Sequence, residues 1–248
     1  IQLNQNNVEL EQIAFAASHD LQEPLRKIRI FSDRLRMLNK NNLQNESAVI
    51  VEKINRSAAQ LHGLILDLVE LTNIVQAKQS FTTVFLDNII SEVEKEFQQS
   101  EMPKIYKLIK AELPAVYGSS DQLQKLFTHL FSNSFAFQSS ERSLAIIISV
   151  QKIKSTAIKN LPAQSSWKEY YHIKFQDNGI GFNPAFKEKL FMPFQRLHNY
   201  GSDDLKRKGM GLAICKRIMV NHNGWIDGDG SETKGAEIHL YFPADILQ

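Results

Sequence analysis

Apolar side chains recur every three or four residues along the first third of the chain, which is the spacing of one face of an α-helix. A first series ends before the polar, turn-prone stretch NKNNLQNES at residues 39–47, and a second series follows it. The series are Leu10, Ala14, Ala17, Leu21, Leu25, Ile28, Phe31, Leu35 and Leu38, then Ile50, Ile54, Ser57, Leu61, Leu64, Leu68, Leu71 and Val75. The pattern predicts two long helices joined by a short loop, an antiparallel all-α helical hairpin.

A lone hairpin of this kind cannot cover the apolar stripe of both its helices. Two copies that pair along their stripes bury both of them in a four-helix bundle, and symmetric pairs are the commonest assemblies. The pattern itself therefore predicts a homodimer.

Near residue 80 the helical period gives way to short β-branched and aromatic runs that alternate with helical segments. We expect strands over 81–86, 105–110, 143–153, 169–175, 224–227 and 236–242, and helices over 87–98, 119–137 and 210–222. Because these segments lack a strict strand-helix-strand rhythm, they predict an α+β sandwich with one sheet and its helices on one face. The chain is thus predicted to be multi-domain, with domains over 1–78 and 79–248.

The composition of the chain mainly excludes certain classes of partner and of site. The 248 residues include 29 Lys and Arg against 27 Asp and Glu, so the net charge of +2 gives no general reason to expect nucleic acid or an anionic membrane as a partner. The single cysteine, Cys215, rules out an internal disulfide framework and a cysteine-rich zinc site. No apolar run approaches the roughly 20 residues that span a bilayer. No secretory signal pattern opens the chain, and the first residue is Ile1 and not Met. We therefore expect a soluble, cytoplasmic piece of a longer sensor, whose other part could include a membrane anchor.

The stretch AASHDLQEPLRKI, residues 16–28, places a histidine beside a carboxylate on the first predicted helix. His19 lies between the inward positions Ala17 and Leu21, off the buried stripe. A neutral imidazole is a competent nucleophile, and Asp20 can hold its ring proton. Pro24 removes a backbone hydrogen bond, so the helix should bend just past the histidine. A surface histidine with an incidental kink is the alternative from these residues alone.

Three features of the second region could contribute to a ligand site. Asn133 lies among apolar residues of a predicted helix, where a satisfied core amide is the default interpretation. The sequence FQDNGIGF at 175–182 ends a strand in a glycine-containing turn, which places Asp177 at its tip, although Asp-Asn-Gly is also an ordinary turn. The sequence RKGMGLAICKRI at 207–218 puts two glycines before a helix, an arrangement that exposes backbone N–H groups to a phosphate.

The string FAASHDLQEPLRKI resembles the phosphoacceptor segment of sensor histidine kinases. The later series of the asparagine helix, DNGIGF, FMPFQRLH and KGMGLAI resembles their ATP-binding domain, an α/β sandwich shared with type II topoisomerases, Hsp90-type chaperones and mismatch-repair ATPases. The resemblance covers essentially the whole chain. It implies that His19 is the phosphorylated residue, that Asp20 is its acid/base helper, and that the cofactors are ATP and Mg²⁺.

The same resemblance implies roles in the nucleotide site. Asn133 would be the Mg²⁺ ligand, Asp177 would bind the adenine amino group, and Gly179 and Gly181 would let the chain pass close to the nucleotide. The further cofactor-binding positions are Phe137, Gly209, Gly211 and Leu212, with Arg196, His198 and Lys208 as candidates for the γ-phosphate. Phe191, Pro193 and Phe194 would form an aromatic box at the start of a mobile lid over residues 195–208.

The sequence departs from the family pattern at four positions of this site. His129 stands where the family usually has a first asparagine, Ser134 replaces an alanine, Ala136 replaces a lysine near the phosphates, and Arg207 replaces a glycine.

The expected function is a homodimeric histidine autokinase that passes phosphate to an aspartate of a response-regulator receiver domain. The alternatives are a degenerate kinase that acts as a dimeric scaffold or phosphorelay adaptor, and a chaperone-like or repair ATPase, which has no need of His19.

Overall fold

The computed structural model describes residues 21, 24–35, 37, 44–76, 80–99, 106–158, 161, 167–195, 209–232 and 234–244. The chain divides into two compact units. One consists of Ile1–Thr72 with Pro193–Met210, and the other of Asn73–Met192 with Gly211–Gln248. The predicted domain boundary at residue 78 stays a prediction. Within the described part of the chain, no helix combines the length and apolarity needed to span a membrane.

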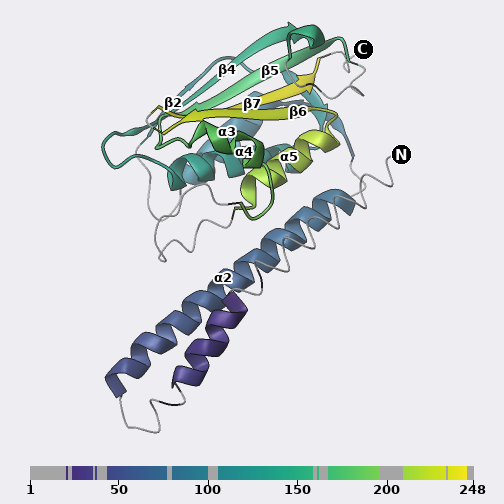
Figure 1. Ribbon diagram of the computed structural model, residues 1–248. Helices are drawn as coiled ribbons and strands as arrows, with labels where there is room; N and C mark the ends of the chain where they lie inside the picture. Colours follow the sequence, from purple (N-terminus) through teal and green to yellow (C-terminus); the bar gives the residue numbers. More distant parts are fainter. Residues whose placement is uncertain are drawn as a thin grey trace. The chain divides into compact units, whose positions relative to one another are not determined.

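The helical unit contains a helix at residues 24–35 and the long helix α2 (Gln44–Gln76), drawn in Figure 1. The ammonium group of Lys53 lies 5.6 Å from the centre of the Phe31 ring, so the two helices contact each other. The hairpin is thus described in part. The predicted loop over 39–47 is wrong at its end, because α2 already begins at Gln44. Polar residues are well tolerated in the first turn of a helix, where several backbone N–H groups lack helical partners.

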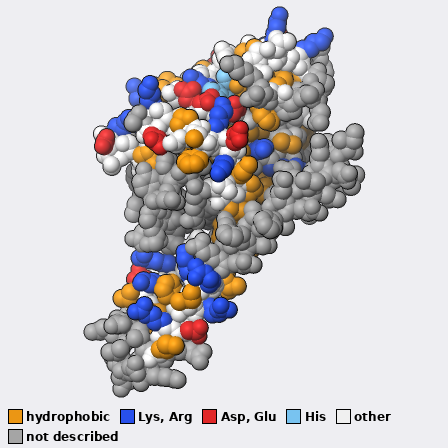
Figure 2. All heavy atoms as spheres, viewed as in Figure 1, with side chains coloured by type: hydrophobic (Ala, Val, Ile, Leu, Met, Phe, Trp, Pro, Cys, Tyr) orange, Lys and Arg blue, Asp and Glu red, His pale blue; other side chains and the backbone are white. Residues whose placement is uncertain are grey.

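The predicted apolar stripe of α2 is confirmed at every seventh residue. Ile50, Ser57, Leu64 and Leu71 are all buried, with exposures of 5%, 7%, 2% and 3%. A spacing of seven keeps side chains on one face of a helix. Other apolar side chains of α2 are exposed: Val49, Val51, Ile65, Leu66 and Val69. Figure 2 shows hydrophobic side chains at the surface of the described helical part, among Lys and Arg.

The second unit is an α/β sandwich, as predicted, but the prediction of one sheet is wrong, because a two-stranded sheet accompanies the five-stranded one. Its elements are β1 (Thr82–Phe85), α3 (Leu86–Gln98), β2 (Tyr106–Lys110), β3 (Ala115–Gly118), α4 (Ser120–Ala136), β4 (Leu144–Lys154), η1 (Ser155–Ala157), β5 (Glu169–Asp177), η2 (Pro184–Lys189), α5 (Gly211–Asn221), β6 (Trp225–Ser231) and β7 (Gly235–Pro243). Five strands form a mixed sheet in the order β2-β4-β5-β7-β6, in which only the β2–β4 pair is parallel. Helices α3, α4 and α5 lie on one side of this sheet (Figure 1).

Strand β3 was not predicted. It pairs antiparallel with β1 in a separate two-stranded sheet, from Thr82 opposite Gly118 to Phe85 opposite Ala115. Its four residues directly follow Pro114 and are too few to show an alternating pattern. Partner pairing, which is not visible in a local window, therefore decides this strand.

The core lies between the sheet and the helices. Alternate residues of β4, β5 and β7 point to the helical side, and α4 and α5 place one face against them. Phe131 of α4 meets Phe175 of β5 edge to face, with ring centres 5.4 Å apart. The fully or almost fully buried residues here are Ile146, Ile148, Ile173, Phe175, Leu240, Phe242, Leu123, Leu126, Phe127, Phe131, Ile214 and Ile218. This packing holds α4 in a fixed register against β5.

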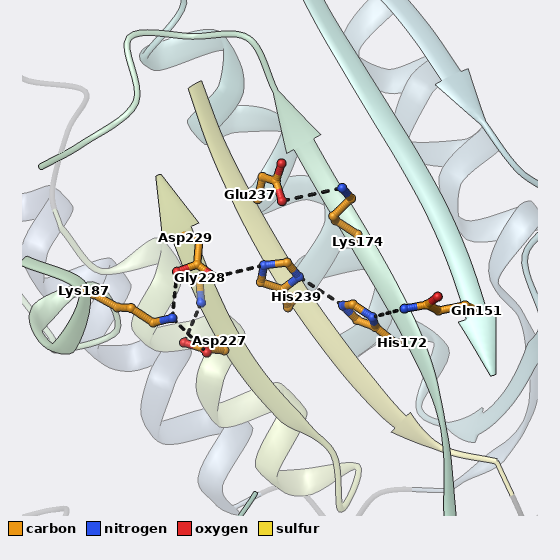
Figure 3. A network of polar contacts seen from close by, with 9 residues as sticks. All are labelled: Gln151, His172, Lys174, Lys187, Asp227, Gly228, Asp229, Glu237 and His239. Atoms are coloured by element: carbon orange, nitrogen blue, oxygen red, sulfur yellow. Dashed lines mark hydrogen bonds and ion pairs between the residues drawn. The ribbon is translucent and has the colours of Figure 1, made fainter. Parts of the chain in front are cut away.

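The opposite face of the sheet carries a chain of polar contacts (Figure 3). Gln151 Nε2 lies 3.0 Å from His172 Nδ1, and His172 Nε2 lies 3.0 Å from His239 Nδ1. His239 Nε2 is 3.4 Å from Asp229 Oδ2, and Asp229 Oδ1 accepts a hydrogen bond of 2.7 Å from Lys187 Nζ. If the Gln151 amide donates, each imidazole accepts at Nδ1 and donates its Nε2–H to the next acceptor. This series of polar contacts links four strands of the sheet to η2.

Burial, together with the nearby His239 and Lys174, lowers the pKa of His172 to about 4, against an ordinary 6.5. The folded state therefore resists protonation, and stability that is present above pH 6.5 is lost as the pH falls toward 4. After allowance for the half-exposed ring, we expect this loss to be about 1 to 2 kcal/mol. Between pH 7 and 4.5, urea unfolding should show a smaller loss in His172→Gln than in the wild type. Equal losses would contradict the prediction.

Candidate functional site

Asp177 is the last residue of β5, and its carboxylate is held from three directions. Its Oδ1 atom accepts from the backbone N–H groups of Gly179 at 2.8 Å and Ala236 at 3.3 Å. Its Oδ2 atom accepts from the hydroxyl of Ser134, on α4, at 3.3 Å. Burial raises the pKa of Asp177, while these hydrogen bonds and the charge of Arg142 lower it in part. The carboxylate thus has a fixed orientation at an edge of the core.

The turn after Asp177 is tied to the loop that joins α4 to β4. Arg142 donates from Nε to the Asn178 carbonyl at 2.6 Å and from Nη2 to the Gly179 carbonyl at 2.7 Å. The Asn178 side chain accepts from the Ala145 N–H at 2.8 Å and donates to the Ser143 carbonyl at 3.0 Å. These contacts hold the turn against β4, so Asp177 does not depend on its own strand alone for its position.

Two glycines of the DNGIGF turn have no room for a side chain. A Cβ on Gly179 would meet the Phe137 carbonyl oxygen, and Ile180 N–H donates to that same oxygen at 2.9 Å. Gly181 has φ +68°, and its Cβ would meet the carbonyl oxygens of Ser231 and Gly235. At both glycines the structure therefore shows an approach of backbone to backbone inside the protein, and their predicted passage close to the nucleotide stays a prediction.

We expect Gly181→Ala to destabilise the second unit by about 3 kcal/mol or more, because it adds a left-handed backbone penalty to a clash with two carbonyls. Gly211→Ala is the matched control. Its Cβ would lie 3.3 Å from a side-chain atom of His129 and not against backbone, and its φ is not in the left-handed region. Thermal unfolding followed by circular dichroism should show a large loss for Gly181→Ala only. Similar melting of both variants would contradict this explanation.

Helices α4 and α5 pack together beside Asp177 and bring His129, Asn133 and Gly211 close to one another. A Cβ on Gly211 would lie 3.3 Å from His129 Nδ1 and 3.8 Å from Asn133 Nδ2. His129 and Asn133 are half-buried, as is Leu212, the second residue of α5. The first backbone N–H groups of an α-helix lack helical partners and favour anions. This corner therefore combines amide, imidazole and backbone N–H groups.

The donor set suits a hard divalent cation. The Asn133 amide would supply an oxygen ligand, and Mg²⁺ prefers oxygen donors while it keeps several waters and phosphate oxygens. Among the residues that the structure describes, no group of three His, Cys, Asp or Glu side chains could hold a metal ion. A cation held by Asn133 would therefore depend on a bound phosphate for further ligands.

Several predicted site residues lie outside the described residues: His19, Asp20, Arg196, His198 and Lys208. Of the predicted aromatic box, Phe191 and Pro193 are half-buried, and Phe194 is 8% exposed with φ +62°. Gly209 has φ +73°, and its Cβ would lie 2.7 Å from the Gln195 carbonyl oxygen. The glycine before α5 is therefore required by its own backbone.

Arg142 and Ala236 are not among the predicted site residues, and Ser134 is predicted only as a departure from the family pattern. Their contacts join positions 36 to 59 residues apart, so no local spacing announces them. Phe137 was expected at the nucleotide. The structure shows its carbonyl oxygen bound to Ile180, which adds a structural role.

The chain is similar to known proteins in sequence and in fold. The family described as histidine kinase-, DNA gyrase B- and HSP90-like ATPase matches residues 118–246, more than half of the chain. Cyanobacterial phytochrome A of Nostoc sp. is 28% identical over 241 residues, which cover 97% of this chain and 29% of that protein. The uncharacterized sensor-like histidine kinase ycf26 of Pyropia yezoensis is 26% identical over 231 residues, which cover 90% of this chain and 32% of that protein.

The chain therefore spans about a third of the length of these relatives. Among solved structures, the Acinetobacter baumannii histidine kinase AdeS superposes with a TM-score of 0.58 at 17% identity, covering 92% of this chain and 98% of that chain, which shows a shared fold. The chain belongs to the histidine kinase-, DNA gyrase B- and HSP90-like ATPase family, and its resemblance to sensor histidine kinases extends over nearly its whole length.

Proposed function

We propose that the chain is the kinase core of a two-component sensor, which transfers the γ-phosphoryl group of ATP to His19 and then to a response-regulator aspartate. The observation that carries this proposal is the held carboxylate of Asp177, linked through Ser134 to the helix that bears Asn133. An oriented carboxylate can accept a hydrogen bond from the adenine amino group. Asn133 and the start of α5 then lie where phosphates and their cation can bind.

In the proposed reaction, the neutral His19 imidazole attacks the γ-phosphorus while Asp20 takes the proton of the other ring nitrogen. An N–P bond forms, the bond from the γ-phosphorus to the bridging oxygen breaks, and ADP leaves. Mg²⁺ neutralises phosphate charge when it is bound. The residues of this chain position the nucleotide, with Arg196, His198 and Lys208 as the candidate cations at the γ-phosphate.

The helical unit is proposed to dimerise as a four-helix bundle. Exposed apolar side chains on α2 and the 57% exposure of Leu25, which lies on the first predicted stripe, support this, since a second copy would cover them.

We further propose that residues 1–78 form the dimerisation and phosphotransfer domain, that residues 79–248 form the ATP-binding domain, and that the fragment works in the cytoplasm. A receiver domain is the proposed partner, with no direct contact to nucleic acid or membrane.

Incubation of the chain with γ-labelled ATP and Mg²⁺ tests the proposal. We expect a label on the protein that is lost in acid and kept in alkali, as a phosphohistidine requires, and none from α-labelled ATP. A purified receiver domain should then remove the label. Absence of protein label, with no calorimetric binding of Mg-ATP at millimolar nucleotide, would favour the degenerate scaffold.

A further inference from the structure

The hydroxyl of Ser134 lies between two acceptors. Ser134 is 1% exposed, and its Oγ atom is 3.3 Å from Asp177 Oδ2 and 3.3 Å from the Leu130 carbonyl oxygen. A hydroxyl has a single hydrogen, so it donates to one of them at a time. An ionised carboxylate is a stronger acceptor than a carbonyl that already serves a helix, so the hydrogen goes to Asp177 while that side chain is ionised.

Several elements around Asp177 influence whether its carboxylate is ionised. The turn supplies the Gly179 N–H, β7 supplies the Ala236 N–H, and α4 supplies the Ser134 hydroxyl. The guanidinium of Arg142 is the neighbouring cation. Burial raises the pKa of Asp177 and these groups lower it, so removal of one of them should let the carboxylate take a proton at higher pH. The two backbone donors bind Oδ1, which leaves Ser134 as the group that orients Oδ2.

We propose that Ser134 is a positioning residue for adenine recognition, a role that rests on the proposed nucleotide site: its hydroxyl holds Asp177 Oδ2 so that the carboxylate accepts from the adenine amino group. The same contact selects adenine over guanine. Guanine carries a carbonyl oxygen in place of that amino group. An ionised carboxylate repels this oxygen, whereas a protonated carboxyl can donate a hydrogen bond to it. Without the Ser134 hydroxyl, adenine binding weakens and the preference over guanine declines, more so as the pH falls.

Ser134→Ala tests the proposal, because alanine removes only the oxygen. The matched control is Ser132→Ala, on an exposed position of the same helix. Calorimetry with ADP and GDP in Mg²⁺ should give about fivefold weaker ADP binding at pH 8, the effect of one indirect hydrogen bond. We expect the deficit to exceed about tenfold at pH 6, with a smaller ADP to GDP preference than in the wild type. A deficit that is the same at every pH would overturn the proposal, since lost packing alone has that effect.

A measurement without nucleotide keeps the test independent of binding. Carboxyl carbon NMR of the free protein should show that Asp177 titrates at higher pH in Ser134→Ala than in the wild type or in Ser132→Ala. Superimposable titrations would overturn the proposal. If the wild type binds no ADP, or if Asp177→Asn binds it normally, the proposed function itself fails and the proposal falls with it. If those two behave as expected and Ser134→Ala matches the wild type at each pH, only the role of Ser134 is refuted.

Discussion

His19→Gln is expected to abolish the acid-labile label that the chain acquires from γ-labelled ATP. Glutamine keeps polar atoms near the ring positions but offers no nucleophilic nitrogen, so no N–P bond can form. Nucleotide affinity should change less than about twofold, because the proposed adenine and phosphate contacts come from other residues. Label should be measured by gel autoradiography, and affinity by calorimetry on the same preparation.

His62→Gln is the matched control, since His62 is exposed on α2 and has no role in the proposed reaction. This variant should be labelled like the wild type. Label retained by His19→Gln would refute the assignment of the phosphoacceptor, whatever the level in the control. Mixed dimers of His19→Gln and Asp177→Asn extend the experiment, because label in the mixture requires that one subunit phosphorylates the other.

Asp177→Asn is expected to weaken ATP binding at least about 100-fold, a loss of about 3 kcal/mol, which is the upper range for a hydrogen bond to a charged group. The asparagine oxygen can still accept from Gly179 and Ala236, so its amide nitrogen takes the place of Oδ2. That nitrogen would present an N–H to the adenine amino group, which is also a donor. The flipped amide is no better, because its nitrogen then faces two backbone N–H groups.

The folded state should tolerate the same substitution. Because burial raises the pKa of Asp177, the ionised form is less favourable in the folded than in the unfolded state, and stability declines as the pH rises through that pKa. A neutral asparagine removes this loss, so the melting temperature at pH 7 should be equal to or higher than that of the wild type. Asp229→Asn changes the charge equally on the other face of the sheet and should keep ATP binding. Near-normal affinity in Asp177→Asn would contradict the proposed adenine site.

Periodicity predicted the elements well because their packing repeats along the chain. The buried series Ile50, Ser57, Leu64 and Leu71 follows the helical period. Alternation and β-branched residues likewise located β4 and β5 within a few residues. Strand β3 could not be predicted in this way. Its four residues follow a proline, carry no recognisable period and form a strand only through pairing with β1.

The order of the helices and strands other than β3, the family resemblance and most of the candidate site residues could be predicted from the sequence, because spacing and residue type are local properties. How these residues are held depends instead on contacts that form in the folded protein. Ser134 and Arg142 reach Asp177 and its turn across 43 and 37 positions of sequence. Such contacts depend on the register of α4 against β5, which core packing sets. Whether the Asp177 carboxylate is ionised therefore depends on contacts that exist only in the folded protein.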